Sequence, residues 1–298
     1  MLAMKKQGWL VAVSLLLGLN VFAQSSICIS NDDFGQPAVI FLDSQVYPMN
    51  KLEAEKLQIH YFCSFAFTEN NEEEKMPKQL SGHYCLQIGN SVTKFQTETR
   101  FKADSVIVNG GSRPKSAEYF SQKANFVFAH DCFYRKGSSL TFTGRLAADD
   151  FMYKETIPPI KWCIRDSVKT ICGYTCRFAE GTFRGRNYQA WFAIDIPMSA
   201  GPWKLNGLPG AILEAHDSLG QVSFVAEKVV EGVTAIYQPE YPYITVSRKQ
   251  YSRLLEQLWK DSALFQANHT SRSSVNTILK EDRIVKPLPG IVILETEE

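Results

Sequence analysis

The sequence lacks the features that mark several large functional classes. Basic and acidic side chains almost cancel, with 32 Lys and Arg against 31 Asp and Glu. A chain this close to neutral has no excess of positive charge with which to hold nucleic acid or an anionic membrane surface. After residue 23 there is no apolar run of the roughly 20 residues that a membrane-spanning helix needs. We therefore expect no nucleic-acid partner and no membrane span in the mature chain.

Catalytic motifs are equally scarce. The chain has five histidines, and none of them forms His-Glu-x-x-His or a close pair. No Gly-x-Ser-x-Gly turn supports a triad of Ser199, His216 and Asp217. Cys176 has no neighbouring base in the sequence that would help to form its thiolate. We expect no catalytic residue and no cofactor.

Three residues keep a metal site open as an alternative, namely His130, Cys132 and His216. Imidazole and thiolate groups both bind transition metals. On a strand, His130 and Cys132 would share one face. Surface or hydrogen-bonded histidines are the simpler interpretation, so we expect no bound metal.

The beginning of the chain has the three zones of a secretory signal peptide. Lys5 and Lys6 precede an apolar run from Leu10 to Leu19, and small side chains at Val21 and Ala23 precede Gln24. The sequence therefore predicts that residues 1–23 are removed on export. It also predicts that residues 24–298 form a single β-rich domain in the periplasm or outside the cell.

All seven cysteines follow the predicted signal peptide, where an oxidising compartment permits disulfides. The odd number leaves at least one thiol unpaired within the chain. Cys163 and Cys172 flank a polar segment at 166–170 that reads as a short turn between two strands. Such a hairpin would place them opposite each other, so they are the candidate disulfide.

Alternation of apolar and polar residues dominates the sequence, as is typical of half-buried strands. The longest case is 57–67, where every odd-numbered residue is apolar, and shorter cases recur at 84–88, 140–146, 188–194 and 222–226. Two helices are expected besides. Ser247 and Gln250 form a capping box before an apolar stripe that includes Leu254 and Leu255, and a weaker helix is expected at 114–124. The predicted fold is mainly β, a curved antiparallel sheet or open, barrel-like domain with one or two packing helices.

The most distinctive residues lie between 174 and 217. They include FRGRNYQAWF at 183–192, IPMSAGPWKL at 196–205 and GLPGAILEAHD at 207–217. This stretch resembles the GLPGLI family of exported bacterial proteins, which carries GR-x-Y-x-AWF/Y, IP-x-S-x-GP and GLPGLILE. Ala211 stands where the family more often has leucine. The resemblance implies a periplasmic or secreted protein of a Gram-negative cell, and it implies no enzymatic activity.

The residues of this stretch suggest a structural loop and, beside it, a binding surface. Proline and glycine fix a turn path, so the segment reads as strand, rigid loop and strand. The loop residues that define it are Gly201, Pro202, Gly207, Leu208, Pro209 and Gly210.

Arg184, Arg186, Tyr188 and Trp191 are the binding candidates, because arginine recognises anions and aromatic rings supply contact area. We expect an exported binding or accessory module for a peptide, lipid or outer-membrane partner. The alternative is a metal- or cysteine-dependent periplasmic hydrolase.

Overall fold

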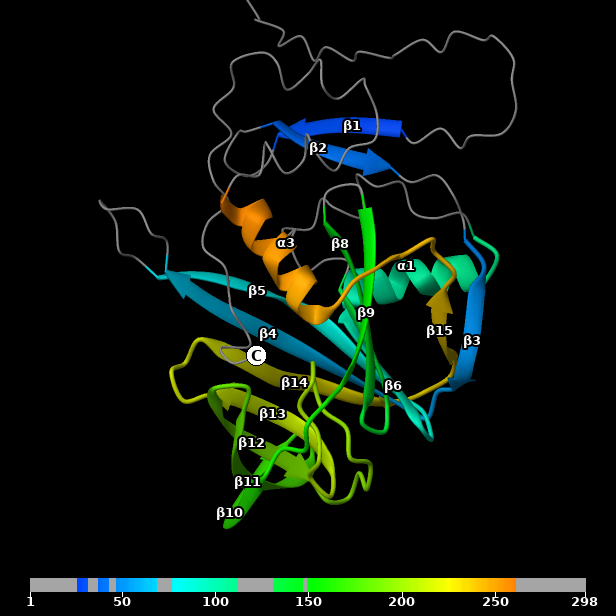
Figure 1. Ribbon diagram of the computed structural model, residues 1–298. Coiled ribbons are helices and arrows are strands. Elements are labelled where there is room, and N and C mark those ends of the chain that lie inside the picture. Colours follow the sequence, from blue (N-terminus) through cyan, green and yellow to red (C-terminus); the bar gives the residue numbers. More distant parts are fainter. Residues whose placement is uncertain are drawn as a thin grey trace, which may run out of the picture.

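The described part of the chain forms one large β-sheet, two small two-stranded sheets (β1 with β2, and β3 with β15) and two short helices (Figure 1). The computed structural model describes residues 26–31, 37–42, 47–68, 77–111, 131–146 and 149–260. The two helices of these residues are α1 (Glu98–Val108) and α3 (Arg248–Lys260). The strands are β1 (Ser26–Asn31), β2 (Pro37–Leu42), β3 (Met49–Ala54), β4 (Leu57–Thr68), β5 (Pro77–Ile88), β6 (Val92–Thr97), β7 (Cys132–Lys136), β8 (Ser139–Leu146), β9 (Asp149–Thr156), β10 (Trp162–Ile171), β11 (Tyr174–Phe183), β12 (Arg186–Ala193), β13 (Ala211–Asp217), β14 (Val222–Glu231), β15 (Ala235–Pro239) and β16 (Ile244–Thr245).

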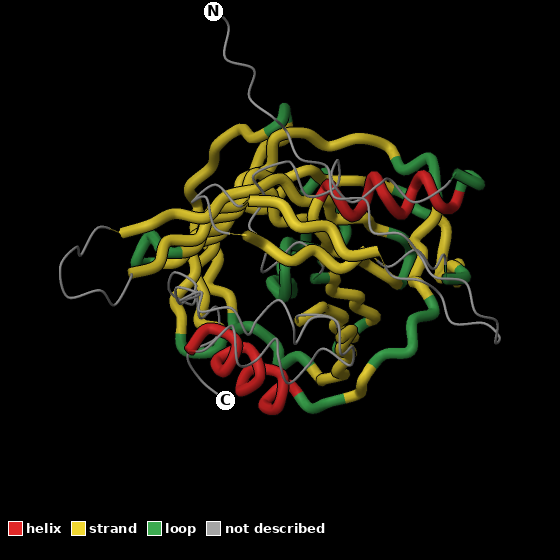
Figure 2. Tube along the Cα trace, turned by 90° about the horizontal axis from the view of Figure 1, so that it is seen from above, coloured by secondary structure: helices red, strands yellow, loops and turns green. Residues whose placement is uncertain are grey.

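The main sheet has twelve strands in the order β10-β11-β12-β13-β14-β4-β5-β6-β7-β8-β9-β16. Two runs of consecutive antiparallel strands, β4 to β9 and β10 to β14, are joined where β14 pairs with β4. Only β16 is parallel to its neighbour, β9. The sheet is strongly curved, and α1 and α3 lie on opposite sides of it (Figure 2). It does not close into a barrel, so the predicted fold class is confirmed.

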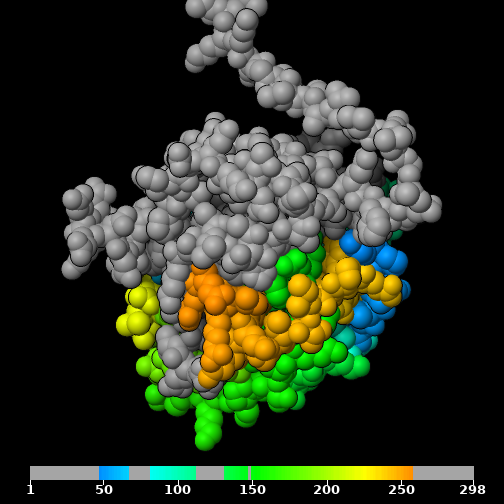
Figure 3. Space-filling view, turned by 45° about the horizontal axis from the view of Figure 1, so that its top comes forward, coloured from blue at the N-terminus to red at the C-terminus, as the bar shows by residue number. Residues whose placement is uncertain are grey.

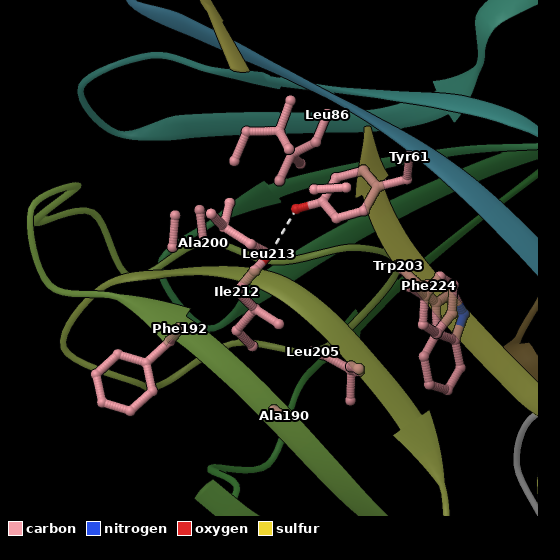
Figure 4. Packing of buried hydrophobic residues seen from close by; sticks show 14 of the residues in the cluster. Tyr61, Leu86, Ala190, Phe192, Ala200, Trp203, Leu205, Ile212, Leu213 and Phe224 are labelled. Carbon is pink, nitrogen blue, oxygen red and sulfur yellow. Dashed lines mark hydrogen bonds between the residues drawn. The ribbon is translucent and has the colours of Figure 1, made fainter. Parts of the chain in front are cut away.

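The core lies on the concave side, where the predicted alternation is confirmed strand by strand. Ile59, Tyr61, Cys63 and Phe65 of β4 are all buried, while Phe62 between them is exposed. Other strands of the sheet add Leu86, Phe192 and Phe224 (Figure 4). In the same cluster the Tyr61 hydroxyl donates to the carbonyl of Ile212 at 2.6 Å, so a polar group of the core has its partner.

The C-terminal helix is confirmed from its first turn. The Gln250 amide donates to the Ser247 hydroxyl at 3.2 Å, and the Ser247 amide donates to the Gln250 side chain at 2.8 Å, which is a capping box. Tyr251, Leu254 and Leu255 then pack against aromatic rings of β8 and β9. Figure 3 shows α3 at the surface beside the segment that carries β16. The side chains of Leu258 and Trp259 lie outside the described residues.

The other helix, α1, was not predicted. It begins at Thr97, whose hydroxyl accepts from the Arg100 amide at 3.3 Å, and it has no apolar stripe. The buried residues of α1 are Arg100 and Ala103, because the helix covers polar strand residues rather than the aromatic core.

The predicted disulfide between Cys163 and Cys172 is wrong, because 166–170 is not a turn. β10 continues through this segment, and the turn falls at Cys172 and Gly173, both with positive φ. Cys163 therefore pairs with Glu180, and Cys172 lies nine residues further along the chain. Nine residues of extended chain cover ~30 Å, far beyond the ~7 Å that a disulfide bridges. Both thiols are free.

Several sequence predictions fall outside the described residues, namely the signal peptide 1–23, the helix at 114–124 and His130. No helix in the described part of the chain is long and apolar enough to cross a membrane.

Candidate functional site

The signature loop, residues 194–210, connects two neighbouring strands and lies against the core. β12 ends at Ala193 and β13 begins at Ala211, opposite it in the sheet. Trp203, Leu205 and Leu208 of the loop are buried in the main core. The predicted order of strand, loop and strand is confirmed.

Side chains from two other strands hold this loop in place. The Arg135 guanidinium of β7 donates to the Ser199 carbonyl at 2.5 Å. The Trp162 indole of β10 donates to the Asn206 carbonyl at 2.7 Å. Within the loop, the Gly207 amide donates to the Ser199 hydroxyl at 3.0 Å. Burial lowers the pKa of Arg135 to about 10, so its charge is partly desolvated where it holds the loop.

Two glycines of the loop are required for different reasons. Gly207 has φ +96°, a conformation that side-chain-bearing residues rarely adopt. Gly210 has no positive φ, but a Cβ there would collide with the backbone carbonyl of Ala193 on the adjacent strand. Both glycines therefore serve the path of the backbone.

A cluster of charges ties the loop to β9 and α3. Lys204, whose side chain is 2% exposed, has its Nζ 2.6 Å from a Glu155 carboxylate oxygen. The other Glu155 oxygen accepts from Arg184 at 2.8 Å and lies 3.4 Å from the Arg248 Nε. One carboxylate thus faces three cations from three separate segments. Because the Glu155 side chain is about nine-tenths buried, removing its charge would strongly destabilise the fold.

The structure does not bring the four predicted binding residues together on one surface. Arg184 belongs to the Glu155 cluster. Arg186 is buried in an ion pair with Asp217 at 2.5 Å, and Tyr188 is 1% exposed within the core. Trp191 lies on the other face of β12, half-buried. Arg184 and Trp191 are both partly exposed, and Trp191 also packs against the main core.

Trp191 belongs to a polar and aromatic face of strands β10 to β13, which we call the outer face. It contacts the Phe178 ring at 4.9 Å between centroids, and the Lys169 ammonium lies 4.5 Å from its ring. Lys169 also binds Glu214 at 2.6 Å. The next pair along the same strands, Glu180 and Gln189, lines a shallow hollow of about 450 Å³.

The outer face carries charged groups of both signs. Arg165 of the edge strand β10 pairs with Glu180 at 3.2 Å, and His216 contacts Gln189 at 3.0 Å. The outer face therefore combines charges of both signs, side-chain amides and a half-buried tryptophan.

The alternative candidates for chemistry are not assembled among the described residues. Ser199 accepts from Gly207, His216 contacts Gln189, and Asp217 binds Arg186, so these three have separate partners. Within this part of the chain no group of three His, Cys, Asp or Glu residues could hold a metal ion. Cys132 donates to Gln96 at 3.1 Å.

The buried cysteines are poor nucleophiles. Burial raises the pKa of Cys176 to about 11, and it raises the pKa of Cys63, Cys85 and Cys132 as well. A thiol attacks as its thiolate, so such groups are almost fully unreactive near neutral pH.

Sequence reasoning missed a second polar region, on the face of β4 to β7 beneath α1. His60, Gln87, Lys94 and Gln96 are buried there. Burial is the main cause that lowers the pKa of His60. In the sequence, polar residues alternate with the apolar ones along each of these strands. A sheet face exposed to solvent gives the same pattern, so the sequence could not show that this face is buried. What identifies the region is the helix above it.

The comparisons with known proteins give one short family match and two distant structural matches. A family model described as a protein of unknown function (Porph_ging) matches residues 180–214, inside the stretch that resembles the GLPGLI family. No curated protein matches. Two crystal forms of PNGF-II are 15% identical to this chain, with TM-scores of 0.47 and 0.45. The matches cover 69% of this chain and 34% of theirs, so no property of PNGF-II is transferred to it.

Proposed function

We propose that this protein is an exported, non-enzymatic member of the GLPGLI family that binds a peptide segment of another cell-envelope protein. Its binding site in this proposal is the outer face of β10 to β13. The signature residues build the scaffold: they fix the loop, the Glu155 cluster and the Arg186–Asp217 pair. Trp191 packs against the core as well, but it lies half-buried on the outer face with the Lys169 ammonium 4.5 Å from its ring, and this observation carries the proposal.

The chemistry of the outer face favours an extended peptide. Gln189 and Asn187 line the hollow and offer amide donors and acceptors, while Trp191 and Phe178 offer a flat apolar contact beside it. Arg165 and Glu180 also line the hollow, and both are partly exposed. A peptide backbone with one apolar side chain would complement this arrangement.

The raised thiol pKa values of Cys176 and Cys132 argue against a hydrolase that uses either of these cysteines as its nucleophile. The export part of the proposal rests on the first 23 residues. Protein purified from its native cell should begin at Gln24 by N-terminal sequencing. Mature protein that still carries Met1 or Met4 would show that export by this signal is wrong.

The binding part can be tested by site-specific photo-crosslinking in the native envelope. A benzoylphenylalanine at Gln189 should crosslink one envelope protein, and the same group at Lys154, exposed on β9, should not. Adding Trp191→Ala should weaken the crosslink from Gln189. Equal crosslinking from both positions, or a yield unaffected by Trp191→Ala, would contradict a site on the outer face.

A further inference from the structure

The strand β10 forms one end of the twelve-stranded sheet, at the bottom of the view in Figure 1. Among the described residues, no strand pairs with its free edge. β10 has ten residues, whereas β16 at the opposite end of the sheet has two. In an antiparallel pair, every second residue turns its N–H and C=O groups away from its partner, so a long end strand presents a row of backbone donors and acceptors. β10 is therefore an edge that a further strand can join.

Two β-branched apolar side chains are exposed on this edge strand. Ile164 is 40% exposed and Val168 is 61% exposed. Ile164 pairs with Ala179 of β11, which is fully buried in the main core, so Ile164 points to the concave side. Val168 follows four residues later and points to the same side, because side chains alternate along a strand. The apolar layer of the concave side thus continues to the edge of the sheet.

The other side of β10 is polar. Cys163 pairs with Glu180, and the Lys169 ammonium lies 4.5 Å from the Trp191 ring, so both residues belong to the outer face. Arg165 lies on the same face, since its guanidinium binds Glu180. A strand that joins β10 has to match this two-sided pattern, because a shift by one residue moves every apolar side chain to the polar face.

A second copy of β10 matches the pattern when it runs antiparallel about a two-fold axis at Asp166. Ile164 of each copy then lies opposite Val168 of the other, so four apolar side chains form one cluster on the concave side. In the same register, Cys163 lies opposite Lys169 on the outer face. The pairing is reciprocal, as a two-fold interface between identical chains requires.

Neighbouring registers of the same two strands fit less well. An axis between two residues would set concave side chains opposite outer ones. An axis at Arg165 would place Lys161, the residue before β10, opposite Lys169. An axis at Ser167 would place Arg165 opposite Lys169. Like charges in directly opposite positions destabilise a sheet, so the axis at Asp166 is favoured.

The charges at this axis balance, although Asp166 lies opposite its own copy. The Arg177 guanidinium of β11 donates to the Asp166 carboxylate and to the Arg165 carbonyl oxygen, both at 3.5 Å. Two acidic and two basic groups would therefore meet at the axis. An unrelated strand brings no second Asp166 and Arg177, and charged residues on an edge strand discourage indiscriminate pairing.

We propose that two copies of this protein join through β10, antiparallel about an axis at Asp166, so that their two sheets form one continuous sheet. The proposal does not depend on the peptide site of the outer face. It has a consequence for that site, because a two-fold axis perpendicular to the sheet leaves both outer faces on the same side. The dimer then presents two copies of Trp191 on one surface.

Sedimentation velocity of residues 24–298, from low to high micromolar concentration, tests the association. A reversible monomer–dimer equilibrium is expected. Val168→Lys places a lysine of each copy against Ile164 of the other and should weaken the dimer at least about 10-fold. Val230→Lys adds the same charge at an exposed position of β14, away from the edge, and should dimerise like wild type.

Disulfide crosslinking with oxidised glutathione tests the register, in a background that carries Cys163→Ser and Cys172→Ser to remove the exposed thiols. The double variant Ile164→Cys and Val168→Cys should give a covalent dimer, because each new thiol faces one in the other copy. Val168→Cys alone should not, since its two copies lie four residues apart along the strands. Four residues span ~13 Å, beyond the ~7 Å that a disulfide bridges.

A dimer that is weakened by Val168→Lys but not by Val230→Lys, with crosslinking of the double variant alone, would support the proposal. Four results would overturn it: a wild-type protein that stays monomeric at high micromolar concentration, a dimer unaffected by Val168→Lys, assemblies larger than a dimer, or equal crosslinking of the single and double variants. Thermal melts show whether each variant is folded, and the crosslinking does not depend on the lysine variants.

Discussion

Replacing Gly210 with alanine should push the end of the signature loop away from the backbone of Ala193 and destabilise the fold. The added Cβ would collide with the Ala193 carbonyl oxygen and would lie 2.7 Å from the carbonyl carbon and 3.2 Å from the Ile194 nitrogen. All three atoms belong to the backbone, so no side-chain rotation relieves the overlap. Either β12 or the start of β13 must move.

The size of the effect follows from what that movement disturbs. Ala193 pairs with Ala211 at the beginning of β13, and the Ala211 amide donates to the Ile196 carbonyl at 3.0 Å. Overpacking a rigid site costs about 1–3 kcal/mol, and a lost backbone hydrogen bond adds about 1 kcal/mol. We expect a loss of about 3 kcal/mol, which lowers the melting temperature of a domain of this size by about 6–12 °C.

Two other glycines calibrate the measurement. Gly207→Ala adds a Cβ with no contact closer than 3.6 Å, so its cost of about 1–2 kcal/mol comes from φ alone. Gly82→Ala, on β5, has ordinary φ and a nearest contact of 3.7 Å, and it should melt within about 2 °C of wild type. Thermal melts by circular dichroism rank the three variants. If Gly210→Ala melts like Gly82→Ala, the loop is not held by this contact and the scaffold interpretation fails.

Three further predictions concern buried charge and packing. Burial raises the pKa of Asp131 from its usual 3.8 to about 8 against the opposing effect of Arg100. The folded chain thus keeps a proton that the unfolded chain has released, and stability falls by on the order of 5 kcal/mol as the pH rises from about 4 to about 8. Asp131→Asn should flatten that slope in urea unfolding, and an unchanged slope would contradict it. Glu155→Gln should cost about 3–5 kcal/mol, because three cations lose this carboxylate, while Glu180→Gln in an exposed pair should cost less than about 1 kcal/mol; equal costs in denaturant melts would refute the difference. Leu255→Ala on half-buried α3 should cost about 1–3 kcal/mol, less than a fully buried leucine, and a Tm equal to wild type would show that the helix does not pack.

The sequence predicted those parts of the fold in which one face of a strand or helix meets the aromatic core. The alternation of apolar residues along β4 and the apolar stripe of α3 both result from such burial. The full length of β10 was not predicted because this strand lies at the edge of the sheet. Its residues 163–168 are all exposed, so the period of two disappears and the strand resembles a turn.

The helix α1 and the polar region beneath it could not be found from periodicity. The helix covers polar residues such as Lys94 and Gln96, so its own buried side chain is Arg100 rather than an apolar stripe. Thr97 was the available signal, as an N-cap. A cavity beside α1 takes residues from Lys51 to Tyr237, and no local pattern connects positions so far apart.

The pairing of β14 with β4 also determines how the molecule can fold. On each side of this pair the strands follow one another along the chain, and most neighbours form hairpins, which assemble in microseconds. The exceptions are β6 with β7, which α1 separates, and β12 with β13, which the signature loop separates. The pair itself joins Phe65 to Val222, and contacts so distant in sequence form slowly. Until they do, β4 and β14 are both open edges able to pair with another chain. Aggregation during refolding should therefore compete with this pairing, and dilution of the chain should favour the native sheet.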